Sequence, residues 1–148
     1  MREGLIPYFG FDLPNCMWPN DGYDPQQSDS NLFRNPALLM VFKHIFTSPT
    51  SAVKELPGQA KTRKPQARIN GMESVTAGSI AYAAVMFRYA ITSSDDWRQD
   101  EKVFYFSEFF RSVMSFFDEE DEDFDAEWVT DLVEYYNVYV LTHILCPY

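Results

Sequence analysis

The sequence has few of the residues that most often build metal and catalytic sites. Only two cysteines occur, Cys16 and Cys146, at opposite ends of the chain and without CxxC spacing. This arrangement favours neither a thiolate metal site nor a disulfide framework, and indicates two free thiols in a reducing compartment. His44 and His143 lie in different predicted helices, and the chain has no HExxH motif. We interpret both as structural or surface residues, and we predict no catalytic residue, metal site or cofactor.

Glycine-rich phosphate loops and long apolar runs are also missing. Gly71 and Gly78 flank a predicted helix start but fit neither GxGxxG nor the P-loop. The uncharged run over 74–87 is shorter than the roughly 20 residues that cross a bilayer. Pro7, Gly10 and Asp12 interrupt the N-terminal apolar residues before a signal-peptide core could form. We therefore expect a soluble intracellular protein, cytoplasmic or nuclear, without membrane contact.

Basic residues are few, with 12 Lys and Arg against 22 Asp and Glu and a formal net charge of -10. This balance argues against a protein whose whole surface binds nucleic acid, because phosphate contacts need clustered Lys and Arg. Five basic residues nevertheless gather in the connection 54–68, which has no interleaved aromatics. Its candidate binding residues could contact phosphates or the acidic block of a second molecule. They are Lys61, Arg63, Lys64 and Arg68.

Acidic residues are abundant and form a continuous block at 118–123. An EF-hand reading starting at Asp121 fails, because Ala126 replaces the required glycine and Leu132 the bidentate glutamate. The block is interpreted as a solvated connection, with weak divalent-cation binding as the alternative.

Thr76 to Ile91 is predicted to form a buried central helix, since apolar residues occupy nearly every face and Arg88 is its only charge. Ser74 or Thr76 is the expected N-cap, and the helix is expected to end near Thr92 or Ser93. A buried charge needs a partner, so we predict a structural ion pair between Arg88 and a carboxylate. A ligand-binding arginine is the alternative.

Three further helices are predicted. The first has Asn35 as N-cap and Pro36 at its first position, and it runs to about Thr47. The others run from Asp96 or Asp100 to 117 and from about 125 to 142 or 143. No alternating strand pattern occurs, so the predicted class is all-α, with a single compact domain of four principal helices.

Apolar periodicity gives each helix a buried stripe. In the first helix the stripe is Leu38, Phe42 and Ile45, with Leu39 and Phe46 beside them. In the third it is Val103, Phe106, Phe110, Val113 and Phe117, widened by Phe109 and Phe116. In the fourth it is Val129, Leu132, Val133, Tyr136 and Val140, with Asp131, Glu134 and Asn137 facing water.

Residues 1–34 contain several prolines and glycines, which rule out a long helix there. They also carry aromatic residues, so we expect an extended arm packed on a helical domain at 35–148, or across a neighbouring subunit. A disordered tail is the alternative. The aromatic content of 17% suggests more rings than one core can hide, and surplus rings are typical of interfaces.

Several segments resemble an uncharacterised domain family abundant in mushroom-forming basidiomycete fungi. The most specific are Ile-Phe-Thr-Ser-Pro at 45–49 and Gly-Met-Glu-Ser-Val-Thr at 71–76, and Tyr135-Tyr136-Asn137 resembles a Trp-Trp-Asn segment of that family. The resemblance implies a fungal intracellular protein. It carries over no activity and no catalytic residue.

Our leading hypothesis is a non-enzymatic helical interaction domain, a scaffold or self-associating protein, because aromatic excess and two opposite charge blocks suit a complementary surface. One alternative is a nucleic-acid-associated module that uses the basic loop 54–68. Another is a metal-dependent hydrolase or nuclease that uses clustered carboxylates.

Overall fold

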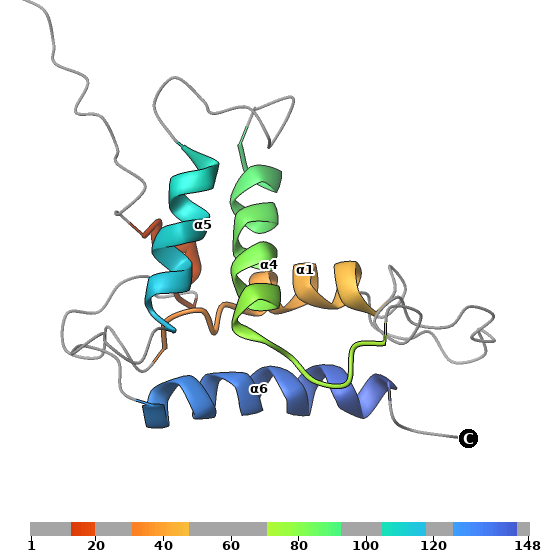
Figure 1. The fold of residues 1–148 in the computed structure, drawn as a ribbon. Helices are drawn as coiled ribbons and strands as arrows, with labels where there is room; N and C mark the ends of the chain where they lie inside the picture. The colour runs from red at the N-terminus through yellow and green to blue at the C-terminus, as the bar shows by residue number, and fades with distance from the viewer. Residues whose placement is uncertain (1–12, 20–30, 48–70, 93–104, 118–125, 145–148) are drawn as a thin grey trace, which may run out of the picture.

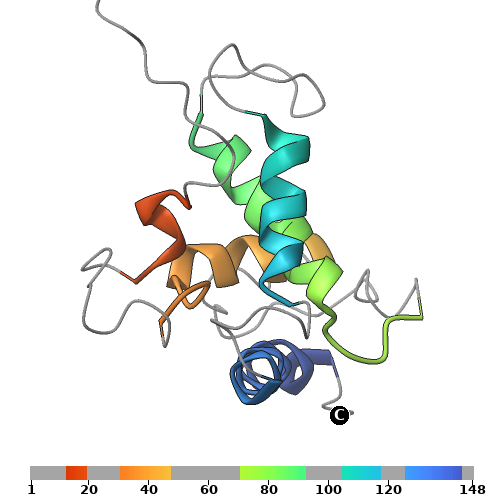
Figure 2. The ribbon, with the colours of Figure 1, turned by 60° about the vertical axis from the view of Figure 1, so that its left-hand side comes forward.

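The computed structural model describes residues 13–19, 31–47, 71–92, 105–117 and 126–144, with side chains through Val140. Within these ranges the chain is all-α, with no strand. It forms a short 3-10 helix η1 (Asn15–Met17) and the helices α1 (Pro36–Phe46), α4 (Ala77–Ala90), α5 (Phe106–Ser115) and α6 (Ala126–Ile144). Helices α4 and α5 lie side by side, α1 crosses α4, and α6 lies below all three (Figure 1, Figure 2).

Helix α1 begins where the Asn-Pro pair predicts. Asn35 is extended and its side chain accepts a hydrogen bond from the backbone N–H of Ala37 at 2.7 Å, which satisfies one of the free donors of the first turn. The buried residues are Leu38, Leu39 and Phe42, all members of the predicted stripe, whereas Ile45 and Phe46 are only half-buried.

Helix α4 is capped by a reciprocal pair. The Thr76 side chain accepts from the Ser79 backbone N–H at 3.2 Å, and Ser79 Oγ accepts from the Thr76 N–H at 3.0 Å. This confirms Thr76 as one of the two predicted caps. Small side chains at Ala81, Ala83 and Ala84 are fully buried, which lets neighbouring helices approach closely. Helix α4 packs against α1 and α5, and its place as the central element of the fold remains a prediction.

The predicted start of the third helix at Asp96 or Asp100 is wrong. Helix α5 begins at Phe106, and Tyr105 before it is extended, with φ -104° and ψ 101°. Tyr105 is aromatic and loses χ1 freedom in a helix, so its extended conformation before the first turn is locally favourable. The buried side chains are Phe106, Phe109 and Val113, so Phe109 is a central member of the stripe and Phe110 is only half-buried.

Helix α6 buries Leu132, Tyr136 and Val140 of its predicted stripe, while Val129 and Val133 are half-buried. The prediction that Asn137 faces water is wrong. Its side-chain oxygen accepts a hydrogen bond from the backbone N–H of Val75, which precedes α4, at 2.9 Å. The partner is distant in sequence, so no helical periodicity could identify it.

Two segments before α1 contribute to the same hydrophobic core as the helices. Met17 at the end of η1 and Trp18 after it are buried, and Leu32 and Phe33 are buried in the turn that leads to α1. The described parts of the predicted arm therefore pack against the helices. The boundary between an arm at 1–34 and a domain at 35–148 remains a prediction.

Candidate functional site

Asn35 joins three parts of the chain. While its side-chain oxygen caps α1, its Nδ2 donates to the backbone carbonyls of Cys16 at 2.9 Å and Trp18 at 2.7 Å. An amide can do both because it carries an acceptor and two donors, whereas an ionised Asp has no donor and Ser has only one. Asn35 thus fixes the segment around η1 against the start of α1.

Phe33, two residues earlier, adopts a left-handed backbone with φ 60°. For a residue other than glycine this conformation costs roughly 1–2 kcal/mol. It buries the Phe33 ring completely, and a buried Phe contributes about 1.5–3 kcal/mol. It also directs the Phe33 carbonyl to the Tyr136 hydroxyl, which donates to it at 2.7 Å. Burial raises the pKa of Tyr136 well above its usual range, so the hydroxyl keeps its proton.

One turn of α6 contacts three residues that are distant in the sequence. Its contacting residues are Tyr135, Tyr136 and Asn137. Tyr136 bonds to Phe33, Asn137 bonds to Val75, and the Tyr135 ring lies under the guanidinium of Arg34, whose Cζ is 5.2 Å from the ring centroid. The three neighbouring residues hold α6 against both the start of α1 and the start of α4. Their observed contacts are structural.

Arg34 begins a row of cations and tyrosines between α1 and α6. It pairs with Asp131, while the rings of Tyr135 and Tyr139 have centroids 4.9 Å apart. Lys43 Nζ then lies 5.9 Å from the centroid of the Tyr139 ring, within the range of a cation–π contact. Burial raises the pKa of Tyr135, with the Tyr139 neighbour adding to it and Arg34 opposing it.

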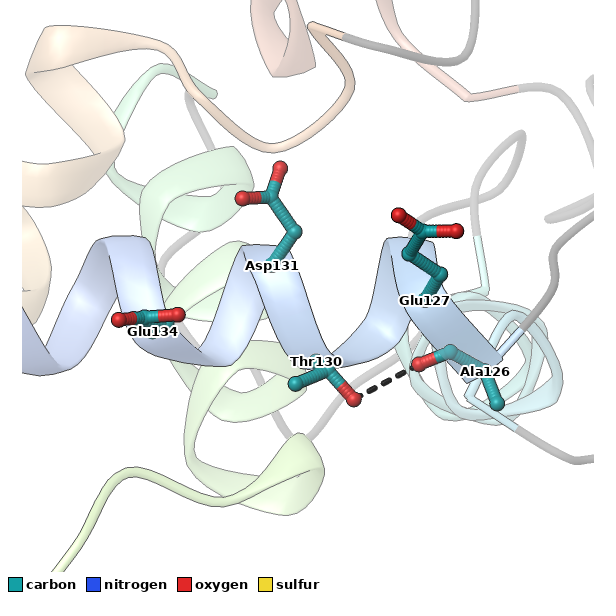
Figure 3. Close-up of a pocket in the computed structure, with 5 residues that line it drawn as sticks. All are labelled: Ala126, Glu127, Thr130, Asp131 and Glu134. Carbon is teal, nitrogen blue, oxygen red and sulfur yellow. Dashed lines mark hydrogen bonds between the residues drawn. The ribbon is translucent and has the colours of Figure 1, made fainter.

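An open depression lies on the first half of α6 (Figure 3). Its charged lining residues are Glu127, Asp131 and Glu134, all exposed; the first two project to the same side of the helix. Across the described residues, no group of three or more His, Cys, Asp or Glu side chains is placed to hold a metal ion. This surface carries negative charge, part of which Arg34 neutralises through Asp131.

The basic candidates Lys61, Arg63, Lys64 and Arg68 lie outside the described residues, as does the acidic block at 118–123. The structure therefore neither brings these two charge blocks together nor separates them. His44 is exposed on α1, and the side chain of His143 is outside the described set.

Arg88 lies in the last turn of α4 and is half-buried. Its charge acts on Cys16, where burial raises the pKa of the thiol and Arg88 lowers it. We expect its carboxylate partner in the third helix, at the N-terminal cap of that helix or in the acidic block. Glu108 lies in α5, but the carboxylates at 95–101 and 118–123 lie outside the described residues, so the Arg88 ion pair remains a prediction.

Sequence reasoning missed the structural role of Leu32 to Arg34 and of Asn137. The Asn35-Pro36 cap was recognisable, but nothing local marks Phe33 as left-handed or Asn35 as a donor to Cys16 and Trp18. The only available signal was the Tyr135-Tyr136-Asn137 segment, which stood out through resemblance.

Comparison with known proteins identifies a family and no function. No curated protein and no solved structure matches the chain. Among the helices that the structure describes, none is both long and apolar enough to span a membrane. A model for a family of unknown function (DUF6698) matches residues 1–141. The chain therefore belongs to this family of unknown function.

Proposed function

We propose that the chain is a non-enzymatic, helical protein-interaction domain that self-associates. The observation that supports this most directly is the exposure of large apolar side chains on α1 and α6. Met40 is 50% exposed, Val138 53% and Tyr139 47%, and Lys43 lies over the Tyr139 ring. Tyr and Met are enriched in protein interfaces relative to the rest of the surface.

Light scattering over a concentration series, repeated at increasing salt, tests self-association. The expected result is a mass above that of the 17.2 kDa chain that rises with protein concentration. Salt should reduce association if exposed charges contribute, because screening weakens exposed ion pairs. A single-chain mass at every concentration and ionic strength would contradict the proposal.

Two other functions remain open as predictions. A nucleic-acid module using Lys61, Arg63, Lys64 and Arg68 requires binding that weakens with salt, and lack of affinity at low salt would exclude it. A metal-dependent hydrolase or nuclease requires magnesium, manganese or calcium binding, which calorimetry would detect. No contact among the described residues favours either function.

We further propose that the protein works inside the cell and that its family is concentrated in mushroom-forming fungi, as the resemblance implies. Thiol titration of denatured protein isolated without reductant should find both Cys16 and Cys146 free, and a disulfide would contradict the intracellular assignment. A survey of the organisms that carry the family tests the second point.

A further inference from the structure

Residues 13–19, which we term the strap, lie at one edge of the described helices, above the start of α1 (Figure 2). The backbone of the strap folds on itself. The N–H of Met17 donates to the Pro14 carbonyl at 2.9 Å. The N–H of Trp18 donates to the Asn15 carbonyl at 3.2 Å. These two bonds form the turn η1 from residues of the strap alone.

The strap meets the helices as a bound peptide would, through buried anchors and main-chain carbonyls. Met17 is fully buried and Trp18 is 7% exposed, and both belong to the core shared with the helices. The carbonyls of Cys16 and Trp18 accept the two hydrogen bonds from Asn35 Nδ2. Burial raises the pKa of the Cys16 thiol and the charge of Arg88 opposes this, so the strap also lies near the last turn of α4.

The surface that receives the strap is held in place by contacts that do not involve the strap. We term this surface the seat, and it consists of Asn35 and the apolar surface under the two anchors. The Asn35 oxygen accepts from the Ala37 N–H in α1. Two residues earlier, the Phe33 carbonyl accepts from the Tyr136 hydroxyl of α6. Residues 20–30 separate the strap from this region in the sequence, so the strap can leave without displacing α1.

We propose that the strap is a detachable, peptide-like occupant of the seat, which leaves it while α1, α4, α5 and α6 stay folded, and that the vacated seat binds a peptide of the same chemistry. That chemistry is a turn that directs two backbone carbonyls at an amide donor and inserts neighbouring Met and Trp side chains. Opening of one contiguous unit requires less free energy than global unfolding. The proposal goes beyond self-association, because a chain that never associates can still release its strap.

Thiol labelling of the native full chain measures release. In a Cys146→Ser background, Cys16 is the single thiol. Asn35→Asp keeps a helix-capping oxygen, but it removes the donor and sets a carboxylate against two carbonyls. It should therefore accelerate labelling of Cys16 about tenfold or more. The new negative charge by itself disfavours the reactive thiolate, so faster labelling reports release of the strap.

Thr76→Ala in the same background is the matched control, since it weakens the cap of α4 and leaves the contacts of the strap intact. Local release predicts that this variant labels at the rate of its parent. Labelling rates that follow the unfolding free energies of both variants would show that Cys16 reacts only after global unfolding, which would overturn the proposal. Equal rates for Asn35→Asp and its parent would overturn it as well.

Peptide binding tests the vacated seat. The probe is a fluorescently labelled synthetic peptide of residues 13–19 that carries Cys16→Ser, and anisotropy measures its binding to full chains. Trp18→Ala in the full chain removes an anchor of the chain's own strap. A seat that is mostly occupied binds with an apparent affinity reduced by its vacant fraction, so Trp18→Ala should bind the peptide about tenfold or more tightly than the wild type. Adding Asn35→Asp to this variant should abolish binding.

Three results would contradict the peptide site. The first is no binding to Trp18→Ala, or binding no tighter than to the wild type. The second is equal binding of a control peptide with alanine in place of tryptophan. The third is loss of the helical circular dichroism signal in Trp18→Ala, which would show that the helices need the strap. Light scattering of the wild type judges self-association independently, so either proposal can fail alone.

Discussion

At the scale of single residues, Phe33 shows how a long-range contact sets a local conformation. Its left-handed backbone is unfavourable by itself, but it buries the ring and aims the carbonyl at Tyr136. The ring also lies 6.0 Å from Phe116 in an edge-on arrangement. Burial outweighs the backbone cost, so the conformation is stable only within the folded chain.

Replacing Tyr136 with Phe tests the hydroxyl contact. The variant should lose about 1–3 kcal/mol of unfolding free energy at neutral pH, because the buried Phe33 carbonyl loses its donor while the ring remains. Urea unfolding followed by circular dichroism measures the loss. A variant as stable as the wild type would show that water or another donor replaces the hydroxyl.

A second prediction for the wild type and Tyr136→Phe concerns the pH dependence of their stability. Since the folded-state pKa of Tyr136 is raised, its stabilising contribution is complete below the ordinary tyrosine pKa of about 10 and falls above it, as the unfolded chain releases its proton first. Well above that pKa, this residue contributes a slope of about -1.4 kcal/mol per pH unit to the unfolding free energy. The stability difference between wild type and Tyr136→Phe should therefore shrink between pH 10 and 11.

At the scale of elements, helix starts were predictable where side chains within one turn define them. Asn35-Pro36 and Thr76 are such cases, because each cap bonds to a backbone N–H two or three residues later. The start of α5 has no side-chain cap, and its N-terminal limit depends on the extended Tyr105. Apolar periodicity continues through Val103 to Phe106 and so could not show where the helix begins.

Thr76→Ala should lower the unfolding free energy by about 1 kcal/mol, because it removes the hydroxyl that accepts a hydrogen bond from the Ser79 backbone N–H at the start of α4. Thr130→Ala is the matched control, since Thr130 is exposed inside α6 and its hydroxyl only bonds back to the Ala126 carbonyl at 2.7 Å. Thermal unfolding should shift for the first variant and stay nearly constant for the second. Equal shifts would mean that the cap contributes nothing specific.

At the scale of the whole molecule, a few polar contacts position segments that the sequence places far apart. Tyr136 reaches back 103 residues to Phe33, Asn137 reaches 62 residues to Val75, and Asn35 reaches 19 residues to Cys16. The first two connect α6 to the segments before α1 and α4, and the third connects the start of α1 to η1. Apolar burial supplies the larger free energy, and these bonds select one arrangement.

Asn35→Ala should destabilise the fold by about 2–3 kcal/mol, the sum of a lost helix cap and two lost hydrogen bonds to backbone carbonyls. Asn35→Ser retains a capping oxygen but cannot donate to both Cys16 and Trp18, so it should lose roughly half as much. Chemical denaturation measures both. A serine variant as stable as wild type would show that the two carbonyl contacts are dispensable.

The sequence by itself determined the all-α class, the approximate extent of α1, α4 and α6, and most of their buried residues. Those properties depend on caps and apolar spacing within a few turns, which a linear pattern contains. Only the tertiary structure decided the conformation of Phe33, the inward bond of Asn137 and the start of α5. Each depends on atoms from distant segments meeting in space, and no periodicity along one segment encodes which groups will meet.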